Sequence, residues 1–522
     1  MSRVVSAGDA REDAHRTWNR DSVKDMRSRT PTFIASLGLL AAGLTGLVSA
    51  PAASAFTPTL TYVPCPAEAE PSGVVRCAEL TVPLDWQTPD DGRTTTIALR
   101  VIPSKRSGGG FTFNPGGPGG EGIDIGADVY LELPQRIRER FDFVMWDPRG
   151  VGLSGPAVTG CEPMPGPDLP PIGPVDWQTA WSDLATRTGE AIADCFARNP
   201  DSAPYLGTWQ VVRDLEAMRE ALGYPRWNYW GMSYGTRIGY TYAKTFPGSI
   251  RTMIVDGSLW PQESVYRLAS QQPAAWVTAL QVYSSVMGRA QARKFEQVLE
   301  VLDDTVLQTP DQTITRWDVG STIYGQLGAQ RLYPQIRATI NILYDAIVVQ
   351  PTTRSRAAAV TQVQALQDSA PDPAEQYIFS FINCADLHDR PTAQTAGRMA
   401  ESAAQDYGNT VALATRNITK CQGLPADYSP GVPREWTTIS LSTPPVVVLS
   451  LGDTNTPWLW GRTMANQYAG SRTINYNSSQ HVTYMQTPSS CVNDPVTRYV
   501  LNRTLPSDNI FCGFVPSPQP EE

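Results

Sequence analysis

A serine flanked by two glycines is the strongest chemical signal in the sequence. The motif Gly-Met-Ser-Tyr-Gly at 231–235 follows an apolar run at 227–230 and precedes a predicted helix at 236–246. A serine on a sharp turn between a strand and a helix has an exposed hydroxyl, and so tight a turn leaves no room for a Cβ at the glycines. We predict that Ser233 is a nucleophile. The alternative is an ordinary glycine-rich turn with a surface serine.

A serine hydroxyl becomes a strong nucleophile only beside a base, which is usually histidine. Histidines stand at positions 15, 388 and 481. In enzymes with the G-x-S-x-G motif on a strand–turn–helix, the chain order is serine, then acid, then histidine. Asp453 follows a predicted strand at 445–451 and precedes His481. We therefore predict that His481 is the general base and acid, and that Asp453 orients it.

Other residues fit these two roles less well. His15 precedes the expected cleavage site of a signal peptide, and His388 precedes the acid. We expect His388 to have a structural or a substrate-contacting role. Asp256 and Asp386 are alternatives for the acid that break its expected place at the end of a strand. Asp453 could also be a mere turn former.

The glycine cluster Gly-Gly-Pro-Gly-Gly at 116–120 is the second chemical signal. Acyl transfer needs N–H donors aimed at the oxygen that becomes negative in the transition state. We predict that the backbone N–H groups of Gly117 and Tyr234 form this oxyanion hole. The cluster lacks the spacing of phosphate-binding loops, so we do not expect a nucleotide there.

These residues need a scaffold that brings the ends of several strands together. The predicted strands lie at 94–102, 111–113, 141–146, 227–230, 253–255 and 445–451, and predicted helices lie at 211–222 and 236–246. Strands that alternate with helices predict an α/β fold with a mostly parallel sheet. Ligands bind such sheets at the carboxyl ends of the strands.

A long segment separates the last two predicted strands. Residues 259–437 contain helical patterns at 290–302, 334–348 and 356–366. A structureless loop of this length is implausible. We predict a core in two parts, residues 56–258 and 438–522, with 259–437 inserted as a helical cap or lid over the carboxyl ends of the strands.

Residues 1–55 are predicted to form a signal-peptide region. Basic residues precede an uncharged stretch at 33–48, and Ala-Ser-Ala at 53–55 has the form of a signal peptidase site. The stretch is shorter than the roughly 20 residues that span a bilayer, which argues against a transmembrane anchor. Met26 is an alternative start of translation. We expect a secreted product that is not held in a membrane, either released or associated with the cell wall.

All eight cysteines follow the predicted cleavage site. An even number in an exported chain favours disulfides, and the C-x-x-C spacing of zinc sites and redox motifs does not occur. The cysteines fall in four separated couples. We predict that they pair in sequential order, as Cys65 with Cys77, Cys161 with Cys195, Cys384 with Cys421, and Cys491 with Cys512.

The composition argues against several classes of function. Of the 522 residues, 41% are hydrophobic and 18% are charged, as in a globular chain rather than a disordered one. The net charge of −9 gives no basic surface for nucleic acid, so we expect no such partner. Two histidines after the predicted cleavage site are too few for most zinc-hydrolase sites, so we predict no metal and no organic cofactor.

Four motifs carry a family resemblance. They read Asn-Pro-Gly-Gly-Pro-Gly-Gly at 114–120, Trp-Asp-Pro-Arg-Gly-Val-Gly at 146–152, Gly-Met-Ser-Tyr-Gly-Thr-Arg at 231–237, and Gly-Asp-Thr-Asn-Thr-Pro at 452–457. Together they resemble the tripeptidyl aminopeptidase branch of the α/β-hydrolases, which is related to the prolyl aminopeptidases. The resemblance extends from about Cys65 to Cys512, and the C-terminal part is similar to the TAP-like region of that branch.

The resemblance implies an α/β-hydrolase fold and a secreted exopeptidase that removes short peptides, often tripeptides, from free N-termini. It assigns Ser233, Asp453 and His481 as the triad, with Gly117 and Tyr234 as the oxyanion hole. The chain departs from the family in two places. It has Asn-Pro at 114–115 where prolyl aminopeptidases usually have a histidine before the glycines, and Glu121 where the tripeptidyl branch often has serine.

An aminopeptidase also has to bind the free ammonium group of its substrate. Partly desolvated carboxylates suit that task, and Glu121 and Glu263 are the candidates, with solvated surface acids as the alternative. Trp458 and Trp460 either line the substrate cleft or pack in the core. Arg149 either braces the loops of the site or pairs with a surface acid.

Two other functions stay open on the sequence. A secreted carboxylesterase or lipase would use the same triad, because fold and triad do not fix the leaving group. A non-catalytic binding protein on the same scaffold would have no need of the three residues in this order. The function that the sequence favours is a serine peptidase whose substrates are peptides with a free N-terminus.

Overall fold

The structure is a computed structural model that describes residues 56–66, 75–308, 312–367 and 373–518. The predicted signal-peptide region, including Met26, lies outside these residues. Within them, no helix combines the length and the apolarity that a membrane span requires.

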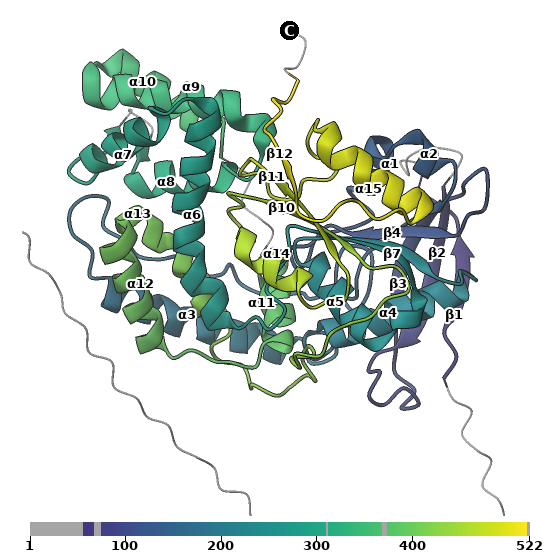
Figure 1. Cartoon of the computed structure of the whole chain (residues 1–522). Coiled ribbons are helices and arrows are strands. Elements are labelled where there is room, and N and C mark those ends of the chain that lie inside the picture. Colours follow the sequence, from purple (N-terminus) through teal and green to yellow (C-terminus); the bar gives the residue numbers. More distant parts are fainter. Residues whose placement is uncertain (1–55, 67–74, 309–311, 368–372, 519–522) are drawn as a thin grey trace, which may run out of the picture. The chain divides into compact units, whose positions relative to one another are not determined.

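Among the described residues, one ten-stranded sheet has the order β1-β2-β3-β5-β4-β6-β7-β10-β11-β12 (Figure 1). The strands are β1 Thr59–Val63, β2 Arg76–Pro83, β3 Thr94–Ile102, β4 Gly110–Asn114, β5 Asp142–Trp146, β6 Trp227–Met232, β7 Ile250–Asp256, β10 Val446–Ser450, β11 Arg472–Tyr476 and β12 Ile510–Cys512. Neighbours from β5 to β12 pair in parallel, and β1, β2, β3 and β5 pair antiparallel. The predicted mostly parallel sheet is confirmed.

The helices fill the connections between these strands. They are α1 Gly126–Glu132, α2 Gln135–Arg138, α3 Trp177–Arg198, α4 Thr208–Ala221, α5 Gly235–Thr245, α6 Val265–Met287, α7 Gln291–Leu302, α8 Arg316–Gln326, α9 Tyr333–Tyr344, α10 Thr353–Gln364, α11 Pro373–Asp386, α12 Ala393–Tyr407, α13 Asn409–Ala412, α14 Trp458–Ala465 and α15 Ser490–Asn502. Short 3₁₀ or π turns are η1 Ala203–Tyr205, η2 Pro247–Ser249, η3 Gln330–Leu332, η4 Asp345–Val349 and η5 Leu413–Thr419.

Side chains of the central strands point alternately into two cores, one on each face of the sheet. Along β10, Val447 and Leu449 join the core that includes residues of α4, α5 and α14, whereas Val446 and Val448 join the core that includes residues of α1, α2 and α15. Successive side chains of a strand face opposite sides, so a strand covered on both faces is apolar throughout. This explains the continuous valine run that the sequence shows at β10.

The segment between β7 and β10 is mainly helical and has cores of its own. It contains α6 to α13 and η5, and the two-stranded pair β8 Leu307–Gln308 and β9 Thr313–Ile314. One core joins α6 to α10, and another joins α12 and η5 to Trp177 and Trp181 of α3. Helix α3 thus packs with the predicted insertion although it precedes residue 259. The domain boundaries at 259 and 437 stay predictions.

The cysteines pair in the predicted sequential order. The bonds join Cys65 to Cys77, Cys161 to Cys195, Cys384 to Cys421, and Cys491 to Cys512. The third bond links α11 to Cys421, which comes shortly after the end of η5, and the fourth links α15 to β12. The first bond ties β2 to the segment that follows β1, and the second ties α3 to the segment that precedes it.

Candidate active site

Ser233 stands on the turn between β6 and α5, and the backbone there is strained. Its φ of 52° lies in the left-handed region that residues with a Cβ rarely adopt. A Cβ at Gly231 would lie 2.5 Å from the carbonyl oxygen of Gly235, and one at Gly235 would lie 2.5 Å from that of Asn114. Both positions therefore require glycine, as the sequence motif predicts. The Ser233 N–H donates to the carbonyl of Asp256 at the end of β7, with a distance of 3.0 Å.

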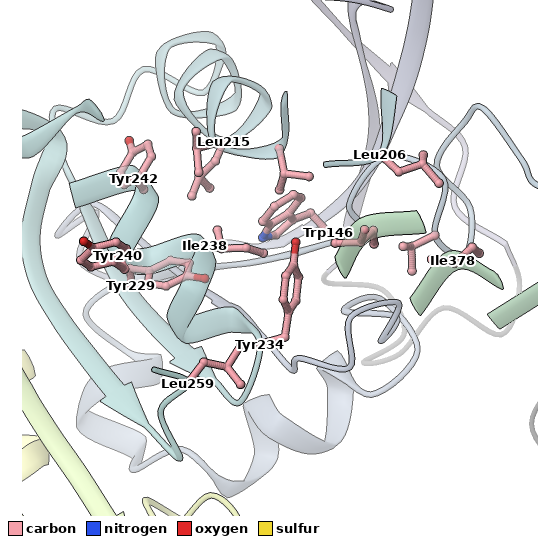
Figure 2. Close-up of a cluster of buried hydrophobic side chains, with 14 of the residues drawn as sticks. Trp146, Leu206, Leu215, Tyr229, Tyr234, Ile238, Tyr240, Tyr242, Leu259 and Ile378 are labelled. Atoms are coloured by element: carbon pink, nitrogen blue, oxygen red, sulfur yellow. The ribbon is translucent and has the colours of Figure 1, made fainter. Parts of the chain in front are cut away.

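The residue after the serine anchors the turn in the core. Tyr234 is buried, and Figure 2 shows its ring pointing from the turn toward Trp146. Its hydroxyl lies 2.6 Å from Thr208 Oγ1 on α4. The buried side chain thus anchors the turn in the core, while the backbone of Tyr234 stays next to the serine.

The glycine loop after β4 passes directly beside the serine. Gly116, Gly117 and Gly119 all have φ values near +100°, which only glycine adopts without strain. A Cβ on Gly116 would lie 2.7 Å from the Ser233 Cβ and 3.1 Å from the Tyr234 nitrogen. The loop therefore brings Gly116 against the serine and the Tyr234 nitrogen, and Gly117, the next residue, lines the same cavity as Ser233.

Asp453 and His481 form a buried hydrogen-bonded pair. Asp453 follows β10 and His481 follows β11, and the imidazole Nδ1 lies 3.0 Å from each carboxylate oxygen. The backbone N–H groups of Asn455 and Thr456 each donate to Asp453 Oδ1 at 2.9 Å, and the Thr456 hydroxyl donates to Oδ2 at 2.8 Å. Burial alone would lower the pKa of His481, but the carboxylate of Asp453 outweighs it and holds that pKa above its ordinary value.

Two glycines from distant segments fix the position of the imidazole. Gly257, with a φ of 60°, follows β7, and a Cβ there would lie 3.2 Å from His481 Cε1. Gly328, between α8 and η3, accepts a hydrogen bond of 2.7 Å from the His481 backbone N–H. Among the described residues, no hydrogen bond joins Ser233 Oγ to His481. Such bonds in unliganded enzymes are often long and tighten when substrate binds.

Asp256, the first alternative for the acid, has another task. It is fully buried at the end of β7, and its two carboxylate oxygens accept the backbone N–H groups of Thr483 and Tyr484 at 2.9 and 2.8 Å. Burial raises the pKa of Asp256 to about 7. Its carboxylate therefore clamps the segment just after His481 to the sheet, while Asp453 makes the hydrogen bond to the imidazole.

A buried ionic cluster that sequence reasoning missed surrounds Arg237, which lines the same small cavity as Ser233. Arg237 on α5 pairs with Glu263 and, at 3.0 Å, with Asp386 of α11. Arg237 also donates to Asn383, and Asp386 accepts the N–H and the hydroxyl of Thr208. Glu263 is 1% exposed, so the alternative of a solvated surface acid is wrong for this residue. The only sequence signal for the cluster was the arginine that ends the motif at 231–237.

Two cavities meet in front of the serine. The smaller, of about 230 Å³, is lined by Ser233, Arg237, Gln272 of α6 and Asn455 among others. The larger, of about 660 Å³, is lined by Glu121, Asp124, Glu375, Arg416 and Lys420. Both share four lining residues, Gly117, Pro118, Phe379 and Asn417. Residues from the sheet side and from the helical segment between β7 and β10 thus line one continuous opening.

Four other residues that the sequence singled out lie away from this opening. Arg149 is fully buried and pairs with the buried Asp214 at 2.6 Å, so the expected surface partner is wrong. Trp460 is buried in the core around α4 and α5, and Trp458 donates to Asn475 at 2.7 Å. Neither tryptophan lines either cavity, which favours the core alternative. His388 is half-buried, and its Nε2 has no partner among the described residues.

Sequence comparison agrees with this geometry. Residues 111–314 match the α/β hydrolase fold, and residues 382–512 match the TAP-like proteins. The chain is an α/β-hydrolase. The serine turn follows β6, and the acid and the histidine follow β10 and β11, which are the places where this fold carries such residues.

Three relatives of this hydrolase have names that indicate an activity. Serine protease Hip1 of Mycobacterium tuberculosis is 29% identical over 85% of this chain and 88% of its own length. Tripeptidyl aminopeptidase of Streptomyces lividans is 26% identical, over 85% of each chain. Carboxylesterase B of Mycobacterium tuberculosis is also 26% identical, over 84% of this chain and 86% of its own. Relatives named as peptidases and as an esterase therefore match most of this chain.

Proposed function

We propose that this hydrolase is an exported serine exopeptidase that releases short peptides, predominantly tripeptides, from free N-termini. The observation that carries the proposal is the Asp453–His481 pair, held at the ends of β10 and β11 on the same side as the strained Ser233 turn. The four disulfides suit an oxidising compartment outside the cytoplasm. The relatives named as a serine protease and a tripeptidyl aminopeptidase support a peptide substrate.

The proposed reaction has two steps. Asp453 keeps a proton on His481 Nδ1, so Nε2 is free to take the proton of Ser233 Oγ as that oxygen attacks the scissile carbonyl. The backbone N–H groups of Gly117 and Tyr234 bind the oxyanion. His481 then gives its proton to the leaving amine, and water hydrolyses the acyl-enzyme by the same route.

Recognition of the substrate ammonium is assigned to the larger cavity. Glu121 lies on its wall, and burial together with the charges of Asp147, Asp124 and Glu375 raises the pKa of Glu121. A cation placed among these carboxylates would relieve their mutual repulsion. Glu263, the other candidate, is already paired with Arg237 and lines neither cavity. Glu121 is therefore the better-supported ammonium ligand.

The experiment that tests the proposal compares one peptide in free and N-acetylated forms. Purified protein is incubated with each form beside a Ser233→Ala control, and the products are identified by mass spectrometry. We expect cleavage of the free peptide alone and a fragment of constant length, three residues, from the N-terminus. Equal cleavage of both forms would indicate an endopeptidase and contradict the proposal.

A carboxylesterase is the second candidate, because carboxylesterase B is as similar to this chain as the tripeptidyl aminopeptidase is. Testing short acyl esters beside the same two peptides separates the two candidates. An esterase would hydrolyse short acyl esters and leave both peptides intact, since an ester needs neither a bound ammonium nor protonation of an amine leaving group.

A further inference from the structure

Two cations line the larger cavity together with its carboxylates. Arg416 belongs to η5 and Lys420 follows it, whereas Glu121 and Asp124 follow the glycine loop and Glu375 is on α11. Among the described residues, none of these five side chains forms an ion pair. Each cation of the cavity therefore lies more than 4.0 Å from each of these carboxylates.

The cationic wall is built into the fold. The disulfide between Cys384 of α11 and Cys421 holds the backbone next to Lys420 against α11. The Lys420 ammonium lies 5.1 Å from the ring centre of Phe379, which is also on α11. Phe379 and Asn417, which follows Arg416, line both cavities. The two cations thus lie near Phe379 on the wall of the larger cavity. This cavity adjoins the smaller one, which Ser233 lines.

Charges on the wall of a cavity that have no ion-pair partner in the protein favour a ligand of opposite charge. Burial and the neighbouring Arg416 lower the pKa of Lys420 to about 8, so its charge is poorly compensated by the protein. An arginine and a lysine together bind a carboxylate strongly, because the arginine offers a planar pair of donors and the lysine a point charge. The carboxylates of the same cavity are left for the ammonium group.

We propose that Arg416 and Lys420 form an anion subsite that binds a carboxylate of the substrate peptide. This inference rests on the proposed peptidase function and adds a substrate class to it, namely peptides with an acidic residue in the segment that fills the larger cavity. The carboxylate can come from an aspartate or glutamate side chain or from the C-terminus of a short peptide. Both sources present the same chemistry to the two cations.

The test uses pairs of peptides that differ only by Glu or Gln at one of the first three positions. Each peptide is made both with a free and with an amidated C-terminus. We expect kcat/KM for the Glu peptide to exceed that for the Gln peptide by about tenfold at one position, because a charged hydrogen bond in such a site amounts to about that factor. A loss on amidation instead would identify the C-terminus as the source. Equal values for all pairs would overturn the inference.

Variants connect the preference to the two side chains. In Arg416→Gln/Lys420→Gln the ratio should fall to about one, whereas Arg293→Gln, which removes an exposed cation of α7, should keep it. Arg416→Glu/Lys420→Glu should prefer Lys over Gln at the same position, a gain that a misfolded variant cannot produce. A Glu preference that survives in the double Gln variant would refute the assignment.

Binding separates this inference from the proposed function. Calorimetric titration of the Ser233→Ala protein with the same peptides measures the subsite without any turnover. If the active protein cleaves no peptide but the Glu peptide still binds about tenfold more tightly, the peptidase proposal fails and the subsite stands. If cleavage occurs and the two peptides bind equally, the subsite fails and the peptidase proposal stands.

Discussion

The imidazole Nδ1 of His481 lies at the same distance, 3.0 Å, from both carboxylate oxygens of Asp453. Both oxygens also accept hydrogen bonds from the turn at 454–456, so the carboxylate cannot rotate away without losing them. The acid is therefore positioned before substrate arrives, and only the bond between the serine and the histidine remains to be formed.

Asp453→Asn should abolish most of the activity without unfolding the protein. The amide cannot hold the imidazole tautomer that leaves Nε2 free to accept a proton, and the equivalent change in other serine hydrolases lowers kcat by about 10⁴-fold. Steady-state hydrolysis and a thermal melt of the same sample check both parts. Retention of more than a tenth of the activity would show that another group orients His481.

The pH profile of kcat/KM should have its acid limb above the ordinary histidine pKa of 6.5. The base works when neutral, and the charges of Asp453 and Asp256 keep the proton on His481 to higher pH. Asp453→Asn should therefore move the limb of the residual activity to lower pH.

The same raised pKa of His481 stabilises the fold below pH 6.5, and this contribution is lost as pH rises through the folded-state pKa.

Gly257→Ala should lower activity far more than stability. The new methyl group would stand 3.2 Å from His481 Cε1 and would push the imidazole aside. A 1 Å misplacement costs about 10²-fold in rate, so a shift of a few tenths of an ångström should cost about fivefold. Gly223→Ala is the matched control, because Gly223 also has a positive φ, 74°, but nothing lies within 4 Å of its Cβ position. Activity and unfolding of both variants should be measured side by side, and equal losses of activity would contradict the prediction.

Glu121→Gln should change KM for free peptides, whereas Glu263→Gln should change the stability of the protein. If Glu121 binds the ammonium, its loss raises KM for free peptides and leaves N-blocked esters unaffected. Glu263→Gln breaks a buried ion pair with Arg237, so it should destabilise the protein by about 3 kcal/mol and affect both substrates alike. Kinetics on both substrate types together with chemical denaturation distinguish the two. An equal effect of Glu121→Gln on esters would remove Glu121 from the ammonium site.

Asp256→Asn should loosen the segment that carries His481. An amide presents only one acceptor to the N–H groups of Thr483 and Tyr484, so one buried donor loses its partner, at about 1–3 kcal/mol. The pKa of Asp256, raised from 3.8 to about 7, means that wild-type stability declines as pH rises from about 4 to about 7 and is level above that, because in this range the unfolded chain loses the proton while the fold keeps it. The variant should lack this part of the decline. Denaturation at about pH 5 and about pH 8 measures it, and an unchanged pH dependence would contradict the assignment.

The sequence was informative where one strand or one turn carries its own signal. The strand predicted at 94–102 matches β3, and the valine run at 445–451 matches β10 with one residue fewer at each end. Strands β1, β2, β11 and β12 escaped prediction, because they lie toward the sheet edges and polar residues interrupt their apolar pattern. Helix α6 escaped too, since Pro273 stands in its interior and is normally a sign of a break.

The residues of the candidate site also divide into those that the sequence predicts and those that it does not. Ser233, Asp453 and His481 could be proposed from a local motif and from chain order. The partners of Arg237 could not, because they lie 26 and 149 positions away in Glu263 and Asp386, and neither stands in a motif. Long-range pairing of buried charges depends on how α5 and α11 pack, and single-sequence patterns do not contain that packing.

The hydrogen bond from His481 to Gly328 restricts how this scaffold can be re-engineered. The residue proposed as the base is tied to the turn between α8 and η3, within the segment between β7 and β10. Excising that segment, or exchanging it for the one of a relative, would leave a backbone donor of the proposed base without its acceptor. A transplant intended to change substrate choice should therefore carry an equivalent of the Gly328 turn.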